Sequence, residues 1–106
     1  MAINNRQRKQ LRNIGHKLKP VVMISGNGLT HSVLGEIERA LNDHELIKIK
    51  LAVVDRQQRK AIIHRICQHT HAEIIQTIGK IALIYLASLQ PNTKLSNVRA
   101  RKTGML

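Results

Sequence analysis

The sequence predicts a single α/β domain, in which an N-terminal helix precedes a β-α-β-α-β-β order and a small mixed four-stranded sheet is packed with helices. The 106-residue chain has the length of one domain with one modest core. Apolar residues recur at helical spacing in three segments, and they alternate or run together in four shorter ones. Because strand–helix–strand connections are right-handed, the strands they join should be parallel, and the last two strands should form an antiparallel hairpin.

A strongly basic amphipathic helix is predicted over residues 5–16. Its narrow apolar stripe, at spacings of three and four residues, consists of Leu11, Ile14 and Leu18. Gly15 could end this helix early. Pro20 cannot continue a helix and favours an extended residue before it. The apolar residues 21–24 are therefore predicted to form a short buried strand, followed by a turn at residues 25–28.

The second helix and the second strand follow this turn. Thr30 can cap the helix through its hydroxyl group, and the polar residues 42–45 end it. The apolar face of the helix carries Val33, Leu34, Ile37, Ala40 and Leu41. Residues 46–54 then alternate as in a strand with one packed and one wetter face. The packed face carries Ile47, Ile49, Leu51 and Val53, and the wetter face carries Lys48 and Lys50.

A third helix and a hairpin complete the domain. Asp55, with Gln58 three residues later, is typical of a capping box, and the helix it starts should run to about Thr70. The apolar stripe of this helix consists of Ala61, Ile62, Ile66 and Cys67. Two apolar, β-rich runs follow, joined by Gly79 and Lys80, which suits a two-residue hairpin loop with glycine first.

The chain is expected to fold over residues 1–87 and to continue as a flexible basic C-terminal tail over residues 88–106. The N-terminus has charge but no apolar signal region after it, and no run approaches the length needed to span a bilayer. Cys67 is the only cysteine, which excludes an internal disulfide. We therefore expect a cytoplasmic monomer that does not interact with membranes.

The formal net charge of +12 points to a polyanionic partner, with nucleic acid as the first candidate. All six acidic residues lie between positions 36 and 73, whereas the two ends of the chain carry only basic charge. The central fold is thus nearly balanced in charge, and the positive excess is displayed from its flanks.

The glycine-containing turn is a candidate phosphate site. Glycine lets another backbone approach because it has no Cβ, and the helix that follows begins with unpaired N–H groups at the positive end of its dipole. A plain turn that needs glycine and binds nothing is the alternative. Lys17 and Lys19, on the approach to the turn, favour binding. The candidate residues of the turn are Ser25, Gly26, Asn27, Gly28 and Thr30.

The cationic surface of the first helix is a second candidate site. No acid is available there to pair with, and like charges on one face reduce stability. A phosphate-binding surface is therefore favoured over a merely solvated face, and its affinity should fall steeply with salt. Lys48 and Lys50 could extend it from the sheet, although a wet strand face explains them equally well. The candidate residues of the helix are Arg6, Arg8, Lys9, Arg12 and Lys17.

Tyr85 is the only aromatic residue in the chain. RRM and OB-type modules stack nucleobases on aromatic side chains, and this chain has almost nothing to stack with. Recognition of a nucleic acid should therefore depend on backbone charge and shape, with modest sequence selectivity. Tyr85 itself is expected at the edge of the core.

Residues 64–71 contain histidines and a cysteine, which are zinc-ligand types. The single cysteine lies in an apolar stripe, so we expect a core thiol with surface imidazoles, and neither a metal nor another cofactor. Cys67 and a histidine could also form a nucleophile pair, but the predicted burial indicates an inert thiol. Paired carboxylates and a phosphate-binding GKT motif are absent from the sequence, so the chain is not expected to be an enzyme.

Four segments resemble, in order and spacing, the bacterial YhbY-type proteins, which are single-domain members of the CRM group of RNA-binding domains. They read LKPVVMISGNGLT (18–30), EIERAL (36–41), HELIKIK (44–50) and IGKIALIY (78–85). The resemblance covers nearly the whole chain to about Tyr85. It implies a fold like the C-terminal half of translation initiation factor three, with a GxxG loop between a strand and a helix as in KH modules.

The resemblance also implies a function, namely binding of ribosomal RNA on a precursor of the large ribosomal subunit as an assembly factor. Ser25 stands where the family has the first loop glycine, and Gly26 follows one place later. Leu86 stands where family members tend to have an arginine. The alternative is a small basic DNA-binding or nucleoid-type structural protein, which would use the same charge without the loop.

Overall fold

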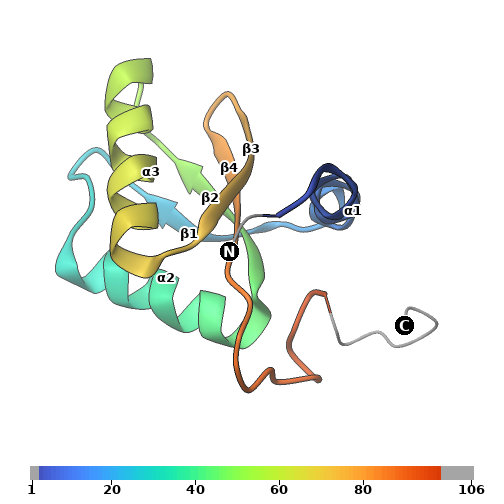
Figure 1. Ribbon diagram of the computed structural model, residues 1–106. Helices are drawn as coiled ribbons and strands as arrows, with labels where there is room; N and C mark the ends of the chain where they lie inside the picture. The colour runs from blue at the N-terminus through green and yellow to red at the C-terminus, as the bar shows by residue number, and fades with distance from the viewer. Residues whose placement is uncertain (1–2, 99–106) are drawn as a thin grey trace.

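The computed structural model of the protein describes residues 3–98, which form three helices and a four-stranded sheet (Figure 1). The elements are α1 (Asn5–His16), β1 (Pro20–Ile24), α2 (His31–His44), β2 (Leu46–Leu51), α3 (Arg56–Thr70), β3 (Glu73–Ile78) and β4 (Ile81–Tyr85). This order confirms the predicted fold class. No helix in the described part of the chain is long and apolar enough to cross a membrane.

The strands lie in the order β1-β2-β4-β3. β1 is parallel to β2, and β4 is antiparallel to both of its neighbours. The two strands that α3 connects therefore point the same way, with β4 between them. The β3–β4 hairpin pairs Ile78 with Ile81 and turns at Gly79, whose φ of +57° favours glycine. The predicted two-residue hairpin is confirmed.

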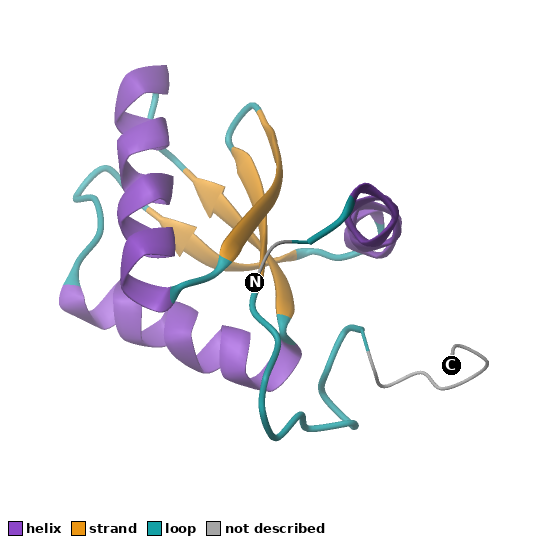
Figure 2. Ribbon diagram, viewed as in Figure 1, coloured by secondary structure: helices purple, strands orange, loops and turns teal. Residues whose placement is uncertain are grey.

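The sheet is covered on one face by α2 and α3 and on the other by α1 (Figures 1 and 2). Alternation along β2 explains this division, because Ile47 and Ile49 face the two-helix side while Leu46 faces α1. The main core, beneath α2 and α3, includes Ile24, Ile37, Leu41, Leu51, Ile66 and Ile84. The smaller cluster beneath α1 consists of Leu11, Leu46, Ile75 and Leu83.

Side-chain caps fix the start of each helix. Asn4 and Gln7 form a reciprocal capping box, in which each side chain accepts a hydrogen bond from the backbone N–H of the other, at 2.8 and 3.2 Å. Thr30 caps α2 as predicted. Asp55 caps α3 by accepting the N–H of Gln57 at 3.1 Å, one residue before the predicted partner.

Gly15 does not end α1, which continues to His16. The reason is close packing of the helix on β4. A Cβ at Gly15 would lie 2.4 Å from Cδ2 of Leu83, so only glycine allows α1 to approach the sheet this closely.

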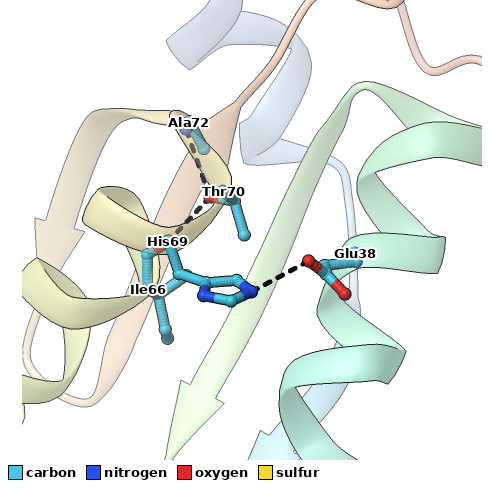
Figure 3. Close-up of polar contacts among 5 residues, drawn as sticks. All are labelled: Glu38, Ile66, His69, Thr70 and Ala72. Carbon is cyan, nitrogen blue, oxygen red and sulfur yellow. Dashed lines mark hydrogen bonds and ion pairs between the residues drawn. The ribbon is translucent and has the colours of Figure 1, made fainter.

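The end of α3 is held by local hydrogen bonds and by a contact with α2 (Figure 3). The Thr70 hydroxyl donates to the carbonyl of Ile66 at 2.8 Å and accepts the N–H of Ala72 at 3.1 Å. His69 Nε2 lies 3.1 Å from Oε2 of Glu38 on α2. Both side chains of this contact are about half exposed, so it adds little to stability.

The packed part of the chain extends beyond residue 87, the predicted end of the folded domain. Glu45 is fully buried, and its carboxylate accepts the N–H of Ser88 at 2.6 Å and the hydroxyl of Ser96 at 2.7 Å. The segment from residue 88 is polar and has no periodic apolar pattern, so the sequence did not indicate that it packs.

The last described residues are attached to the start of β2 and to α1. The Asn97 side-chain amide donates to the carbonyl of Leu46 at 2.6 Å, and its backbone N–H donates to the carbonyl of His44 at 2.9 Å. Val98 packs against the cluster beneath α1. The rest of the predicted tail, residues 99–106, lies outside the described residues.

Candidate nucleic-acid interface

The loop between β1 and α2 is a tight turn. The N–H of Gly28 donates to the carbonyl of Ser25 at 2.9 Å, and the N–H of Asn27 lies 3.4 Å from the Ser25 hydroxyl oxygen. Gly28 has a φ of +81°, a conformation that favours glycine. The backbone shape of the turn thus accounts for Gly28 without any ligand.

Gly26 is not explained in the same way. Its φ is not positive, and a Cβ at this position would meet no heavy atom within 4 Å. The fold therefore does not require glycine at position 26. What the missing side chain provides is an exposed stretch of backbone that another molecule can approach closely.

The N-terminus of α2 follows the turn. The Thr30 hydroxyl accepts the N–H of Val33 at 3.2 Å, so the predicted cap is confirmed. The N–H groups of His31 and Ser32 belong to the first turn and have no acceptor within the helix. No acid lies in this first turn, so the positive end of the helix dipole is not neutralised locally. An anion can bind at such a position.

Two other connections, the one from β2 to α3 and the one from β3 to β4, lie at the same edge of the sheet as this turn. The carbonyl of Ile24 accepts the N–H of Ala52, and the carbonyl of Lys80 accepts the N–H of Leu51, both at 2.7 Å. The loop edge, as we name this region, comprises Ser25–Thr30 and the exposed cations Lys50, Arg56, Lys60 and Lys80.

Arg56, Lys60 and Lys80 were not among the predicted site residues. A signal for two of them was present in the sequence. Because parallel strands end at the same edge of a sheet, Arg56 and Lys60, which follow the second strand, should lie near the turn that follows the first. Arg59 differs from them, because its guanidinium donates to the carbonyls of Val53 and Val54 at 2.8 and 2.7 Å and so holds this connection in place.

Lys17 and Lys19 are not brought to the glycine turn. They lie at the opposite end of β1, and the five residues of that strand span about 16 Å. Both are exposed and adjoin the end of α1. The α1 face, as we name it, consists of Arg6, Lys9, Arg12, Lys17 and Lys19.

The predicted cations of α1 are not equivalent. Lys9 is exposed and Arg12 is half-buried. Arg8 is also half-buried, and its Nη1 donates to the carbonyl of Ile74 at 2.7 Å. Arg8 therefore attaches α1 to the edge strand β3, and at least part of its role is structural.

Lys48 lies between the α1 face and the loop edge, to which Lys50 belongs. Both lysines alternate with the buried residues of β2 and so face the α1 side of the sheet. Lys48 pairs with Pro20 near the end of α1, whereas Lys50 pairs with Met23 near the glycine turn.

The histidine and cysteine run of α3 has a different environment. His69 contacts Glu38, and within residues 3–98 no three His, Cys, Asp or Glu side chains gather where they could hold a metal ion. Burial, and secondarily the Glu73 carboxylate, raise the pKa of the half-buried Cys67 thiol. A raised pKa leaves less thiolate at neutral pH, which disfavours nucleophilic chemistry.

Tyr85 ends β4, is half-buried and packs against the cluster beneath α1. This is the position expected for it at the edge of the core. Residues Met23, Ile78 and Ile81, which lie on the same sheet face nearer to the loop edge, are aliphatic. The sheet thus has no aromatic platform on this face over the described residues.

Together, the fold and its charge distribution define a class: a small, strongly basic α/β domain with a glycine turn between the first strand and the second helix. The chain belongs to the CRS1 / YhbY (CRM) domain family, whose model matches residues 3–85. The family membership expected from the four sequence segments is therefore confirmed.

Relatives with similar sequences carry RNA-binding names. A Pseudomonas aeruginosa protein named "Probable RNA-binding protein PA4753" is 50% identical over 98 residues, which cover 92% of this chain and 94% of that protein. A Haemophilus influenzae protein named "RNA-binding protein" is 46% identical over 94 residues, covering 89% and 95%. The solution structure of SAV1595 from Staphylococcus aureus superposes with a TM-score of 0.74 at 25% identity, covering 84% of this chain and 93% of that one.

Proposed function

We propose that this chain binds RNA through the α1 face and the loop edge, as a non-catalytic protein of the cytoplasm. The observation that carries the proposal is the uncompensated charge of α1. No acidic residue precedes Glu36, so the cations of α1 have no carboxylate partner on their own helix. Such a surface favours a polyanion, and the names of the relatives favour RNA among polyanions.

The mode of binding follows from the chemistry of the two surfaces. Lysine and arginine side chains of α1 neutralise phosphates. The open backbone at Gly26 and the first turn of α2 supply N–H donors to a phosphate, as in the KH mode of clamping a nucleic-acid backbone. Without aromatic side chains to stack bases, the protein reads charge and shape more than sequence.

The RNA that we propose is ribosomal RNA on a precursor of the large ribosomal subunit, where the protein acts as an assembly factor. Membership of the CRS1 / YhbY (CRM) family and the resemblance to YhbY-type proteins support this target. A small domain that binds backbone and shape suits a transient role on RNA that is still folding.

The test is sucrose-gradient fractionation of cell extract, probed for this protein and followed by crosslinking and sequencing of the bound nucleic acid. Co-migration with large-subunit precursors, with crosslinks in their ribosomal RNA, is the expected result. Recovery with chromosomal DNA would instead support a nucleoid-type structural protein. Migration only with free protein would contradict both functions.

A further inference from the structure

The face of the sheet beneath α1 is covered at one end only. Residues that pair directly across neighbouring strands share a face, so this face consists of successive rows. The row of Leu46, Tyr85 and Glu73 lies at the end where α1 packs. The row at the other end runs from Met23 through Lys50 and Ile81 to Ile78, and none of these four residues is buried.

Between these rows lies a third, in which Lys48 pairs with Leu83 and Leu83 with Gln76. Gly15 of α1 packs against Leu83 of this row, which is buried. The uncovered strip, as we name the remaining surface, consists of Met23, Lys48, Lys50, Gln76, Ile78 and Ile81.

The uncovered strip exposes apolar surface. Met23 and Ile78 are 59% and 64% exposed, which is unusual for two large apolar side chains of one sheet. Beside them, a hollow of about 180 Å³ lies between His16 at the end of α1 and the side chains of Ile78 and Ile81. Drug-sized ligands occupy pockets of roughly 300–1,000 Å³, so this hollow suits a single ring rather than a complete small molecule.

The charge of the strip has one sign. Lys48 and Lys50 are its two charged residues, and the strip contains no carboxylate. Glu73, the acidic residue on this face of β3, belongs to the row beneath α1. A partner that covers the strip must therefore offer negative charge next to flat apolar surface.

The position of the strip between two cationic surfaces identifies this partner. One end of the strip adjoins His16 and the α1 face, and the other adjoins the glycine turn, because Met23 precedes Ser25 by two residues. The strip thus adjoins both surfaces that we propose to bind RNA, and its Lys48 and Lys50 continue the positive charge from one surface to the other.

We propose that the uncovered strip binds an unpaired segment of the RNA, with bases against Met23, Ile78 and Ile81 and phosphates near Lys48 and Lys50. This inference rests on the proposed function and adds the preferred form of RNA. Methionine is suited to the contact because its flexible, polarisable thioether adapts to flat ring surfaces. Unpaired bases expose those surfaces, whereas bases within a duplex do not.

A second copy of this chain fits the strip less well. A two-fold interface through the strip would bring the lysines of one copy against those of the other, between molecules that each carry a net charge of +12. RNA supplies the opposite charge, so we assign the strip to RNA.

The test compares the double variant Met23→Ser/Ile78→Ser with the native protein on two RNAs that have the same number of phosphates. One is a fully paired hairpin, and the other carries part of its length as an unpaired extension. Affinities are measured by fluorescence anisotropy over a range of salt concentrations. Leu89→Ser, which changes a fully exposed leucine outside the strip, is the matched control.

The double variant should bind the RNA with the extension about tenfold more weakly, because it loses the apolar contact between the unpaired bases and two large side chains. Its affinity for the paired hairpin should stay within about twofold of native, and its salt dependence should be unchanged because no charge is removed. Equal affinities of variant and native protein for both RNAs would overturn the proposal, as would an equal loss on both.

Two further results separate this inference from the proposed function. If the native protein binds neither RNA, the proposed function itself fails. If it binds both but shows no preference for the extension, only the strip assignment fails. If the double variant does not fold, the native protein is crosslinked to the extension with ultraviolet light instead. The crosslinks should map to the peptides that contain Met23 or Ile78. Their absence from these peptides would overturn the assignment.

Discussion

Gly26 allows the role of the glycine turn in binding to be separated from its role in folding. Because its φ is not positive and its surroundings are open, Gly26→Leu should change the free energy of unfolding by less than about 0.5 kcal/mol. The added side chain covers the exposed backbone, so RNA affinity should fall about tenfold through lost phosphate hydrogen bonds. Urea denaturation and RNA titration at one fixed salt concentration measure the two effects.

Gly28→Ala is the matched control for this change. Its φ of +81° makes any side chain unfavourable, so it should lower the free energy of unfolding by about 1 kcal/mol. A fully stable Gly26→Leu variant with native RNA affinity would show that the turn does not touch RNA.

The Cys67 thiol gives a prediction that depends on pH. Burial, and secondarily Glu73, raise its pKa in the folded state. Below the ordinary thiol pKa, Cys67 is protonated in both the folded and the unfolded chain. The stabilisation of the folded state that is linked to the raised pKa is then fully present. As pH rises above the ordinary thiol pKa the unfolded chain ionises first, so this stabilisation is lost progressively.

Reaction of the native protein with a disulfide reagent should accordingly be slower at pH 8 than that of a cysteine in an unstructured peptide, and should accelerate only at higher pH. The rate against pH is the measurement. The same protein in denaturant is the control and should react like the peptide. A native rate equal to the peptide rate at pH 8 would indicate an accessible thiol with an ordinary pKa.

The docking of α1 depends on Gly15, which lies against Leu83 of β4. In an isolated helix Gly→Ala would stabilise by about 1 kcal/mol. Here the new Cβ would lie 2.4 Å from Cδ2 of a buried leucine, so Gly15→Ala should lower the free energy of unfolding by about 1–3 kcal/mol. Adding Leu83→Val should recover part of the loss, as a double-mutant cycle by urea denaturation would reveal. A stabilised Gly15→Ala variant would mean that α1 is not held this close to β4.

The segment after β4 depends on the buried carboxylate of Glu45. Ser96→Ala removes a hydroxyl donor to that carboxylate and should lower the free energy of unfolding by about 1–3 kcal/mol. Ser88→Ala is the matched control, since Ser88 contacts Glu45 through its backbone N–H, which the substitution keeps. Thermal unfolding should therefore separate the two variants. Equal melting temperatures would show that the segment is not anchored by Ser96.

Local features of the elements could be predicted from the sequence, because they depend on neighbouring residues. The cap at Thr30, the hairpin turn at Gly79 and the alternation of β2 are all of this kind. The features that the sequence did not predict are contacts between distant parts of the chain. Neither the burial of Ser96 nor the packing of Gly15 leaves a periodic pattern in the sequence.

The candidate site shows the same division. The residues of the turn could be chosen from their sequence, since a strand, glycines and a helix cap are contiguous there. Lys17 and Lys19 were assigned to the turn because they precede it in the chain, but an extended strand carries the chain away from them. Arg56 is distant in sequence, yet the parallel pairing of β1 and β2 places it at the loop edge.

Across the molecule, charge is segregated by the sheet. Glu36, Glu38 and Asp43, three of the six acids, lie on α2, whereas α1 on the opposite face carries none. The sheet lies between α2, which carries these acids, and α1, whose charged residues are all basic; Figure 2 shows the two helices on opposite faces of the sheet. A polyanion should be drawn to the α1 side, which orients the protein before close contacts form.

This segregation predicts how single charges affect the salt dependence of RNA binding. The logarithm of affinity should fall linearly with the logarithm of salt concentration, because binding releases condensed cations from the RNA. Lys9→Gln, on the exposed side of α1, should reduce the magnitude of this slope by about one, because one fewer cation is released on binding. Arg39→Gln removes the same charge from the acidic side, next to Glu36 and Glu38, and should leave the slope native. Equal effects of the two substitutions would mean that net charge, and not the α1 face, determines binding.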